Sequence, residues 1–295
     1  MAVTLAVDRD DVVGLDEFID FVNREVDLRD RDSLLGAAPR LRALANDRGL
    51  VARRLNALVE NLFTGEVSPS AQSIFLGAGE GFYVRANLWP SNADISAGRI
   101  YQDRFSYHIA HDHNYDFLTV NHFGPGYRTD IYDYDFAALA GHPGEPVQMR
   151  FLETVHFRSG MVMLYRASQD LHVQYPPEDF SISLNLMVAG PEVRLRDQLF
   201  FDLERKCLLD YPADDDASRR VSMLRLAGLA GDGNTRELLD GLSRTHPCRR
   251  TRLAAYAALA QMAPAAAAEL WRRAGGDREP LVAEAARSWL AEHGD

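Results

Sequence analysis

Between residues 72 and 188 the sequence reads as a succession of short β-strands, and this feature constrains the fold most strongly. Runs rich in aromatic and β-branched residues are separated by Gly, Pro, Asn and Asp, which is the pattern of strands joined by turns. The expected strands are 72–76, 82–88, 104–111, 116–122, 129–134, 148–153, 161–166, 170–175 and 180–188. Because no helical pattern alternates with them, a parallel α/β sheet is disfavoured and a closed or double-sheet all-β unit is predicted.

Helical patterns flank this region on both sides. Near the N-terminus apolar residues recur at the spacing of one helix face, at Leu15, Phe18, Ile19, Val22 and Val26. Near the C-terminus two alanine-rich segments, 252–259 and 282–290, recur after roughly 30 residues and resemble short HEAT-type repeats. We therefore predict an α+β chain with three parts: an N-terminal helical segment over 1–65, a β unit over 66–212 and a C-terminal helical domain over 213–295.

The charge balance and the targeting patterns limit the partners. The formal net charge of −11 is opposite to the basic surface that nucleic acids require. No apolar run approaches the roughly 18 residues of a membrane span, and the N-terminus does not read as a secretory signal. Cys207 and Cys248 form no CxxC pair, so neither a redox motif nor a zinc knuckle is indicated. We expect a cytoplasmic protein with no nucleic-acid or membrane partner.

The histidines are concentrated in the β region. Seven of the nine lie there, which makes this region the place to look for a metal site: His108, His111, His113, His122, His142, His156 and His172. Residues i and i+2 of a strand point to the same face, so His111 and His113 can share a metal ion. A third protein ligand has to come from another strand, and His172 is the best candidate.

These residues resemble the two sequence motifs of the cupin superfamily, and the resemblance covers the β region. The first motif is a strand carrying HxH, followed by an acidic residue and a glycine. It corresponds here to His111, His113, Asp116 and Gly124. The second motif begins with a glycine and ends with a histidine, which correspond here to Gly160 and His172. The departures from the usual motifs are Phe105, Asp116, Arg166 and Ser168.

The resemblance implies a cupin-like double-stranded β-helix barrel that binds one divalent metal through His111, His113 and His172. Asp116 stands where the superfamily usually has a glutamate, and it comes earlier in the motif. It is expected either as a further ligand or as a carboxylate that orients a ligand imidazole. A nitrogen-rich site with open positions suits Fe(II), which we expect, and Zn, Mn and Ni remain alternatives.

Two residues near the second motif are candidates for binding the substrate. Tyr165 and Arg166 could both face the barrel interior. A tyrosine there is usually a core residue whose hydroxyl needs a partner. Arg166 is the candidate for binding a substrate carboxylate, because the guanidinium fork matches a carboxylate. A surface salt bridge is an equally good interpretation of Arg166.

The first functional hypothesis is an Fe(II)-dependent cupin oxygenase that uses O₂ on a small polar substrate, such as an amino acid or a derivative. It follows from the resemblance to three-histidine cupin dioxygenases. The second hypothesis keeps the metal but makes the chain an isomerase, epimerase or lyase, in which the metal polarises a carbonyl. The third is a non-enzymatic ligand-binding barrel. In each case the C-terminal helices are candidates for binding a protein partner or a second copy of the chain.

Overall fold

The computed structural model describes residues 2–62, 72–102 and 105–293. They form two compact units. The first unit comprises Met1–Tyr134 and Met149–Val193, and the second comprises Asp135–Gln148 and Arg194–Asp295. The N-terminal helices therefore share a unit with the strands, whereas the segment 135–148 belongs with the C-terminal helices.

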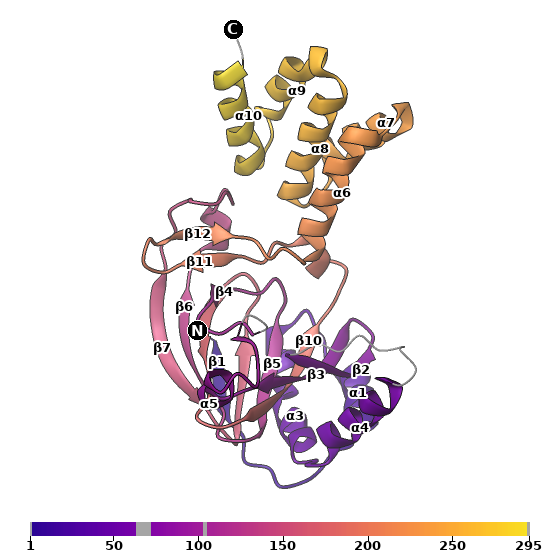
Figure 1. The fold of residues 1–295 in the computed structure, drawn as a ribbon. Helices are drawn as coiled ribbons and strands as arrows, with labels where there is room; N and C mark the ends of the chain where they lie inside the picture. Colours follow the sequence, from indigo (N-terminus) through magenta and orange to yellow (C-terminus); the bar gives the residue numbers. More distant parts are fainter. Residues whose placement is uncertain (1, 63–71, 103–104, 294–295) are drawn as a thin grey trace. The chain divides into compact units, whose positions relative to one another are not determined.

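Two antiparallel sheets make up most of the first unit (Figure 1). One sheet has the strand order β1-β8-β5-β10-β3-β2. Its strands are β1 (Val3–Ala6), β2 (Ser73–Gly79), β3 (Phe82–Trp89), β5 (Phe117–Phe123), β8 (Met161–Tyr165) and β10 (Ser181–Val188). Within this unit the other sheet has the order β4-β9-β6-β7. Its strands are β4 (Ala110–His111), β6 (Tyr127–Asp133), β7 (Arg150–Phe157) and β9 (Asp170–Tyr175).

Helices accompany the sheets of the first unit. They are α1 (Leu15–Glu25), α2 (Arg31–Gly36), α3 (Ala38–Ala45), α4 (Leu50–Leu62) and α5 (Asn92–Ser96). Helix α1 follows the apolar stripe seen in the sequence, and it buries Phe18 and Val22. The N-cap of α2 is Asp30, whose side chain accepts a hydrogen bond from the backbone N–H of Asp32, so a donor at the helix start is satisfied.

Strand β3 shows how the first sheet separates two environments. Phe82, Val84 and Ala86 belong to a core that α1, α3 and α4 complete on one face of the sheet (Figure 1). Side chains alternate along a strand, so the other residues of β3 point to the opposite, inner face. They are Tyr83, Arg85, Asn87 and Trp89. Two of them, Tyr83 and Trp89, join a second core that contains residues of both sheets.

The second unit is a short β-hairpin and a series of helices. Its strands are β11 (Phe200–Asp202) and β12 (Cys207–Asp210), and its helices are α6 (Asp216–Ala230), α7 (Gly233–Thr245), α8 (Arg249–Met262), α9 (Ala267–Ala274) and α10 (Pro280–His293). Short 3-10 helices lie at Phe136–Ala138, Val193–Leu195 and Pro264–Ala266. Helix α8 packs against α6, α7, α9 and α10 (Figure 1). Among the described residues, no helix has both the length and the apolar character needed to cross a membrane.

The structure confirms the α+β class and the antiparallel β region. The closed barrel is not confirmed, because neither sheet closes on itself among the described residues. The expected strand 104–111 starts outside the described residues, and its described part forms a strand only at Ala110–His111. His108 interrupts it with a positive φ of 62°, a conformation that extended strands do not use. Strand β1 at Val3–Ala6, which pairs with β8, was not predicted.

Candidate metal centre

The three predicted histidine ligands come together in the first unit. His111 ends β4 and lies directly opposite His172 of β9 in the antiparallel register. His113 follows just beyond the end of β4. The ring centroids are 4.3 Å apart for His111 and His172, 5.1 Å for His111 and His113, and 5.0 Å for His113 and His172. One ligand nitrogen from each ring lies within 4.8 Å of the other two.

The backbone fixes which nitrogen of His111 can bind a metal. Its Nδ1 lies 2.8 Å from the backbone oxygen of Ile109. A carbonyl oxygen only accepts, so Nδ1 carries the proton and donates it. The lone pair of the neutral imidazole is then on Nε2. A hydrogen bond of this kind is the usual support of a metal-ligating histidine, because it fixes both the tautomer and the ring orientation.

His172 is completely buried, and neither of its ring nitrogens has a hydrogen-bond partner among the described residues. A buried polar group without a partner is costly, and a bound ligand is one explanation for such a group. Burial lowers the pKa of His111 and holds the pKa values of His113 and His172 well below the ordinary 6.5. All three imidazoles are therefore neutral at pH 7, the form that binds metals. The donor set fits a divalent transition metal.

Aromatic side chains surround the histidines. Tyr115 stacks on His113 at 4.9 Å, and Phe117 meets the same ring edge-on at 4.9 Å. Phe117 also stacks on Tyr165 at 4.7 Å, and Tyr165 lies 4.6 Å from His172. An apolar shell of this kind limits water access and lowers the local dielectric around a metal. Of the two predicted substrate-binding residues, Tyr165 thus lies in the wall beside the histidines, where burial raises its pKa well above 10.

Arg166, the other predicted substrate-binding residue, lies in an ion pair. Its Nη2 is 2.6 Å from Oδ1 of Asp170, and its backbone N–H donates to Oδ2 of the same carboxylate at 2.7 Å. The side chain of Asp170 is fully buried and that of Arg166 is 14% exposed. This pair closes the turn between β8 and β9, and so helps to position the strand that carries His172.

Asp116, the expected acidic residue of the first motif, is also held by protein groups. Its carboxylate accepts hydrogen bonds from the backbone N–H of Ala167 at 2.6 Å and from Nε of Arg31 at 3.2 Å. The group of three ligand atoms consists of the histidines, and Asp116 is not part of it. These contacts tie the first turn of α2 to the turn before β9. Asp116 therefore lies where it can support the position of His172 through the chain.

Sequence reasoning missed Arg85, a cation beside the histidines. Arg85 is on the inner face of β3, where its positive charge adds to the effect of burial in lowering the pKa of His113 and also acts on the pKa of Tyr115. The alternation of apolar residues in 82–88 shows that one face of this strand is buried, and it leaves Arg85 on the other face. The sequence contains no local signal that this face meets the strand ending at His111.

The remaining histidines of the β region have other contacts. Nδ1 of His122 donates to the backbone oxygen of Ala45 at 2.9 Å, as expected for a structural residue. His108 packs edge-on against Tyr175 at 5.3 Å. In the second unit, Nε2 of His142 lies 3.2 Å from Glu284. The clustering of histidines in the sequence therefore indicated the right region, and the motif spacing selected the three that converge.

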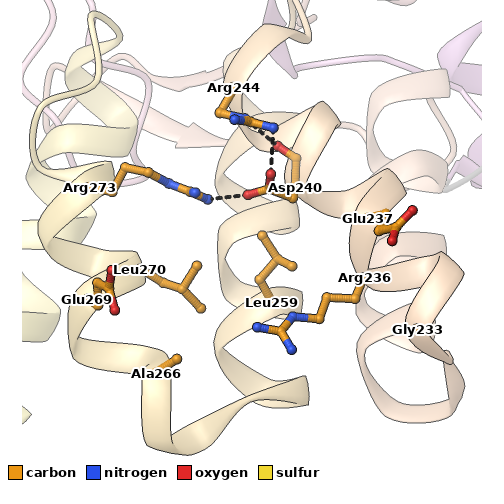
Figure 2. Close-up of a pocket in the computed structure, with 10 residues that line it drawn as sticks. All are labelled: Gly233, Arg236, Glu237, Asp240, Arg244, Leu259, Ala266, Glu269, Leu270 and Arg273. Atoms are coloured by element: carbon orange, nitrogen blue, oxygen red, sulfur yellow. Dashed lines mark hydrogen bonds and ion pairs between the residues drawn. The ribbon is translucent and has the colours of Figure 1, made fainter.

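The second unit contains a groove of about 780 Å³ between α7, α8 and α9 (Figure 2). Its lining residues include three arginines and three acidic residues, and Asp240 pairs with both Arg244 and Arg273 (Figure 2). Salt bridges of this kind are typical of a solvated helix surface. The groove contains neither a histidine nor a cysteine, so the histidine group of the first unit remains the candidate metal centre.

No protein-family model matches the sequence, and no curated protein sequence matches it significantly. Among solved structures, the chain is similar to hydroquinone 1,2-dioxygenase from Sphingomonas sp. TTNP3, with 12% identity, 43% of this chain and 71% of that chain covered, and a TM-score of 0.28. It is also similar to a structure of the DMSP lyases RdDddP and RnDddQII, with 14% identity, 43% of this chain and 50% of that chain covered, and a TM-score of 0.24.

Similarities this low carry no argument about fold or function. The chain spans half the length of the lyase structure that it matches. The resemblance of the C-terminal helices to HEAT-type repeats has no support from these comparisons. The function proposed below therefore depends on the chemistry of the histidine group itself.

Proposed function

We propose that this chain is a cupin-type, Fe(II)-dependent oxygenase for a small polar substrate, with His111, His113 and His172 as the metal ligands. The observation that carries the proposal is the convergence of three neutral imidazoles, with ligand nitrogens within 4.8 Å of one another. The two nitrogens of His172 are buried without a partner among the described residues. Three nitrogen ligands leave further coordination positions of a transition metal open.

The residues of this chain prepare the site in distinct ways. The backbone oxygen of Ile109 holds His111 with its Nε2 lone pair available to a metal. The rings of Tyr115, Phe117 and Tyr165 limit the access of water to the histidines. When bound, Fe(II) would supply the binding and activation of O₂, which amino-acid side chains alone do not provide. Zn, Mn and Ni would fit the same ligands, and with one of these metals the chemistry would be that of a Lewis acid.

Metal content and O₂ uptake test the proposal together. The full chain is purified without oxygen as wild type and as His111→Ala, His172→Ala and His156→Ala; the last removes an exposed histidine of β7 and serves as a matched control. The wild type and the control are expected to contain about one iron per chain. Loss of a group that only orients a metal ligand lowers metal affinity roughly 10- to 100-fold. Because His111→Ala and His172→Ala each remove a proposed ligand itself, each should lower metal affinity by more than this.

Iron-loaded wild type is then expected to consume O₂ in the presence of small polar compounds, and His111→Ala is expected not to. Wild type that binds none of Fe(II), Mn(II), Ni(II) and Zn(II) would contradict the metal centre. Turnover of the same compounds under strict anaerobiosis would contradict the oxygenase and favour a metal-dependent isomerase or lyase. If His111→Ala still consumes O₂, the reaction does not depend on the three-histidine site.

A further inference from the structure

A band of polar residues crosses the inner face of the first sheet. Arg85 of β3 lies directly opposite Asn185 of β10, which in turn lies opposite Thr119 of β5. Two residues beyond Arg85 on β3, Asn87 lies opposite Ser183 of β10. Polar side chains at such positions need partners inside the protein or from a ligand.

Several members of this band satisfy one another. Thr119 donates to Oδ1 of Asn185 at 2.7 Å, and Ser183 donates to the same oxygen at 3.3 Å. Nε1 of Trp89 donates to Oγ of Ser183 at 2.9 Å. The hydroxyl protons of Thr119 and Ser183 are thus both donated to Asn185. Asn87 is only 6% exposed. Its buried Oδ1 accepts no hydrogen bond from the described residues.

Arg85 forms no ion pair with a carboxylate in the described part of the chain. Its buried Nε has no hydrogen-bond partner there. The neighbouring Tyr115 is a phenol, which supplies no negative charge at neutral pH. A guanidinium that is partly buried without a counter-ion is costly, and a carboxylate is the partner whose geometry fits it best.

The position of Arg85 connects this charge to the candidate metal centre. Arg85 lies on the same face of β3 as Tyr83 and Trp89, close enough for its charge to act on Tyr115 and His113, and the ring of Tyr115 stacks on His113 at 4.9 Å. His113 is the partly exposed member of the triad, whereas His111 and His172 are buried. Arg85 is also partly exposed. Of the three histidines, the partly exposed His113 is therefore the one whose pKa the charge of Arg85 affects.

We propose that Arg85 binds the carboxylate of a small hydroxy- or aminocarboxylate, and that Asn87 accepts a hydrogen bond from an O–H or N–H group of the same molecule. Residues i and i+2 of a strand are about 7 Å apart, which a molecule of this size can bridge through its hydrogen bonds. The inference deepens the proposed function by naming the substrate class of the same site. No bond is made or broken in this binding step.

Direct binding measurements test the proposal with two matched pairs of probes. Lactate is compared with lactamide, and serine with serine amide, because each amide keeps the hydroxyl or amino group and loses the carboxylate charge. Calorimetric titrations use wild type, Arg85→Gln, Arg85→Lys and Arg128→Gln, each both metal-loaded and metal-free. Arg128 is an exposed arginine of β6 that packs over Tyr175, so Arg128→Gln makes the same change of charge away from the site.

Wild type should bind at least one acid about 10- to 100-fold more tightly than its amide, the range of a charge-assisted hydrogen bond. Arg85→Gln should remove this preference and leave the affinity for the amide unchanged. Arg85→Lys should restore part of it, and Arg128→Gln should match wild type. Metal content and thermal unfolding are compared in every variant, so that a loss of folding is recognised.

Equal affinity for acid and amide in wild type, no binding of either acid, or an acid preference that survives in Arg85→Gln would each overturn the proposal. These outcomes are separate from failure of the proposed function. An acid preference that depends on Arg85, in a protein that consumes no O₂ with any probe, would support the carboxylate site and contradict the oxygenase. Iron-dependent O₂ uptake with unchanged kinetics in Arg85→Gln would support the oxygenase and contradict the carboxylate site at Arg85.

Discussion

The paired buried arginines of the second unit contrast with three polar residues of the first unit, although each unit contains both kinds of group. In the second unit, buried Arg252 pairs with buried Asp277, and buried Arg249 pairs with Asp197 at 3.3 Å. In the first unit, polar atoms of His172, Arg85 and Asn87 are buried without partners among the described residues. In the first arrangement each charge meets an opposite charge, so removing one partner destabilises the fold. In the second arrangement the polar atoms lack a protein partner, as expected for a ligand site.

The energetic reason for this difference is that a buried charge or polar group is costly until a partner compensates it. A protein partner compensates it permanently, and removing that partner is then strongly destabilising. A ligand compensates it only when bound, so the metal-free and substrate-free fold carries the cost. Sites that bind ligands commonly reduce the stability of the fold in this way. Three experiments test whether the two units differ as described.

The largest effect is expected for Asp277→Ala in the second unit. The substitution leaves the guanidinium of Arg252 buried, with only the partly exposed Glu279 at 4.0 Å as an opposite charge. Breaking a buried ion pair from one side costs about 3–5 kcal/mol of unfolding free energy. Urea unfolding measures this cost, and Arg278→Gln, which removes an exposed arginine, is the control. Metal content should not change, and a loss below that of the control would contradict the structural role.

A smaller effect is expected for Arg166→Gln in the first unit. Asp170 would lose its bonds to the guanidinium but keep the backbone N–H of residue 166. The expected loss of unfolding free energy is about 1.5–3 kcal/mol, the contribution of hydrogen bonds to a charged group. Affinity for lactate and serine should stay at the wild-type value. If Arg166→Gln instead loses affinity for lactate and serine while its free energy of unfolding is unchanged, Arg166 and not Arg85 binds the carboxylate.

The smallest effect is a pH dependence of the metal-free protein. Burial holds the pKa values of His113 and His172 well below 6.5, whereas in the unfolded chain they return to the ordinary value. Below pH 6.5 the unfolded state therefore binds protons that the folded state does not, and stability falls as the pH falls. Each such histidine contributes about 1.4 kcal/mol per pH unit.

Urea unfolding of the metal-free protein at a series of pH values measures this slope. His172→Leu should reduce the slope by the contribution of one histidine, because one fewer proton is taken up on unfolding. It should not lower the free energy of unfolding at neutral pH, because it removes two unpartnered buried nitrogens. His156→Leu, which changes an exposed histidine, is the control. An unchanged slope in His172→Leu would mean that this imidazole titrates normally in the folded state, contrary to its burial.

Much of the secondary structure could be predicted because its signals are local. The spacing from Leu15 to Val26 predicted α1, and turn residues separated most of the strands at nearly the right places. The expected strand 148–153 is instead Arg150–Phe157, since strand ends depend on the pairing partner. No local pattern indicated that the segment 135–148 belongs to the other unit.

The sequence by itself determined which three histidines were expected to converge, because motif spacing is a property of neighbouring residues and of two short segments. Only the tertiary structure decided which arginine lies beside them. Arg166 is six residues from His172 in the chain, yet it pairs with Asp170. Arg85 is distant in sequence and reaches Tyr115 and the environment of His113. The physical reason is that the register between strands depends on long-range pairing and on burial of the opposite face, which no local pattern encodes.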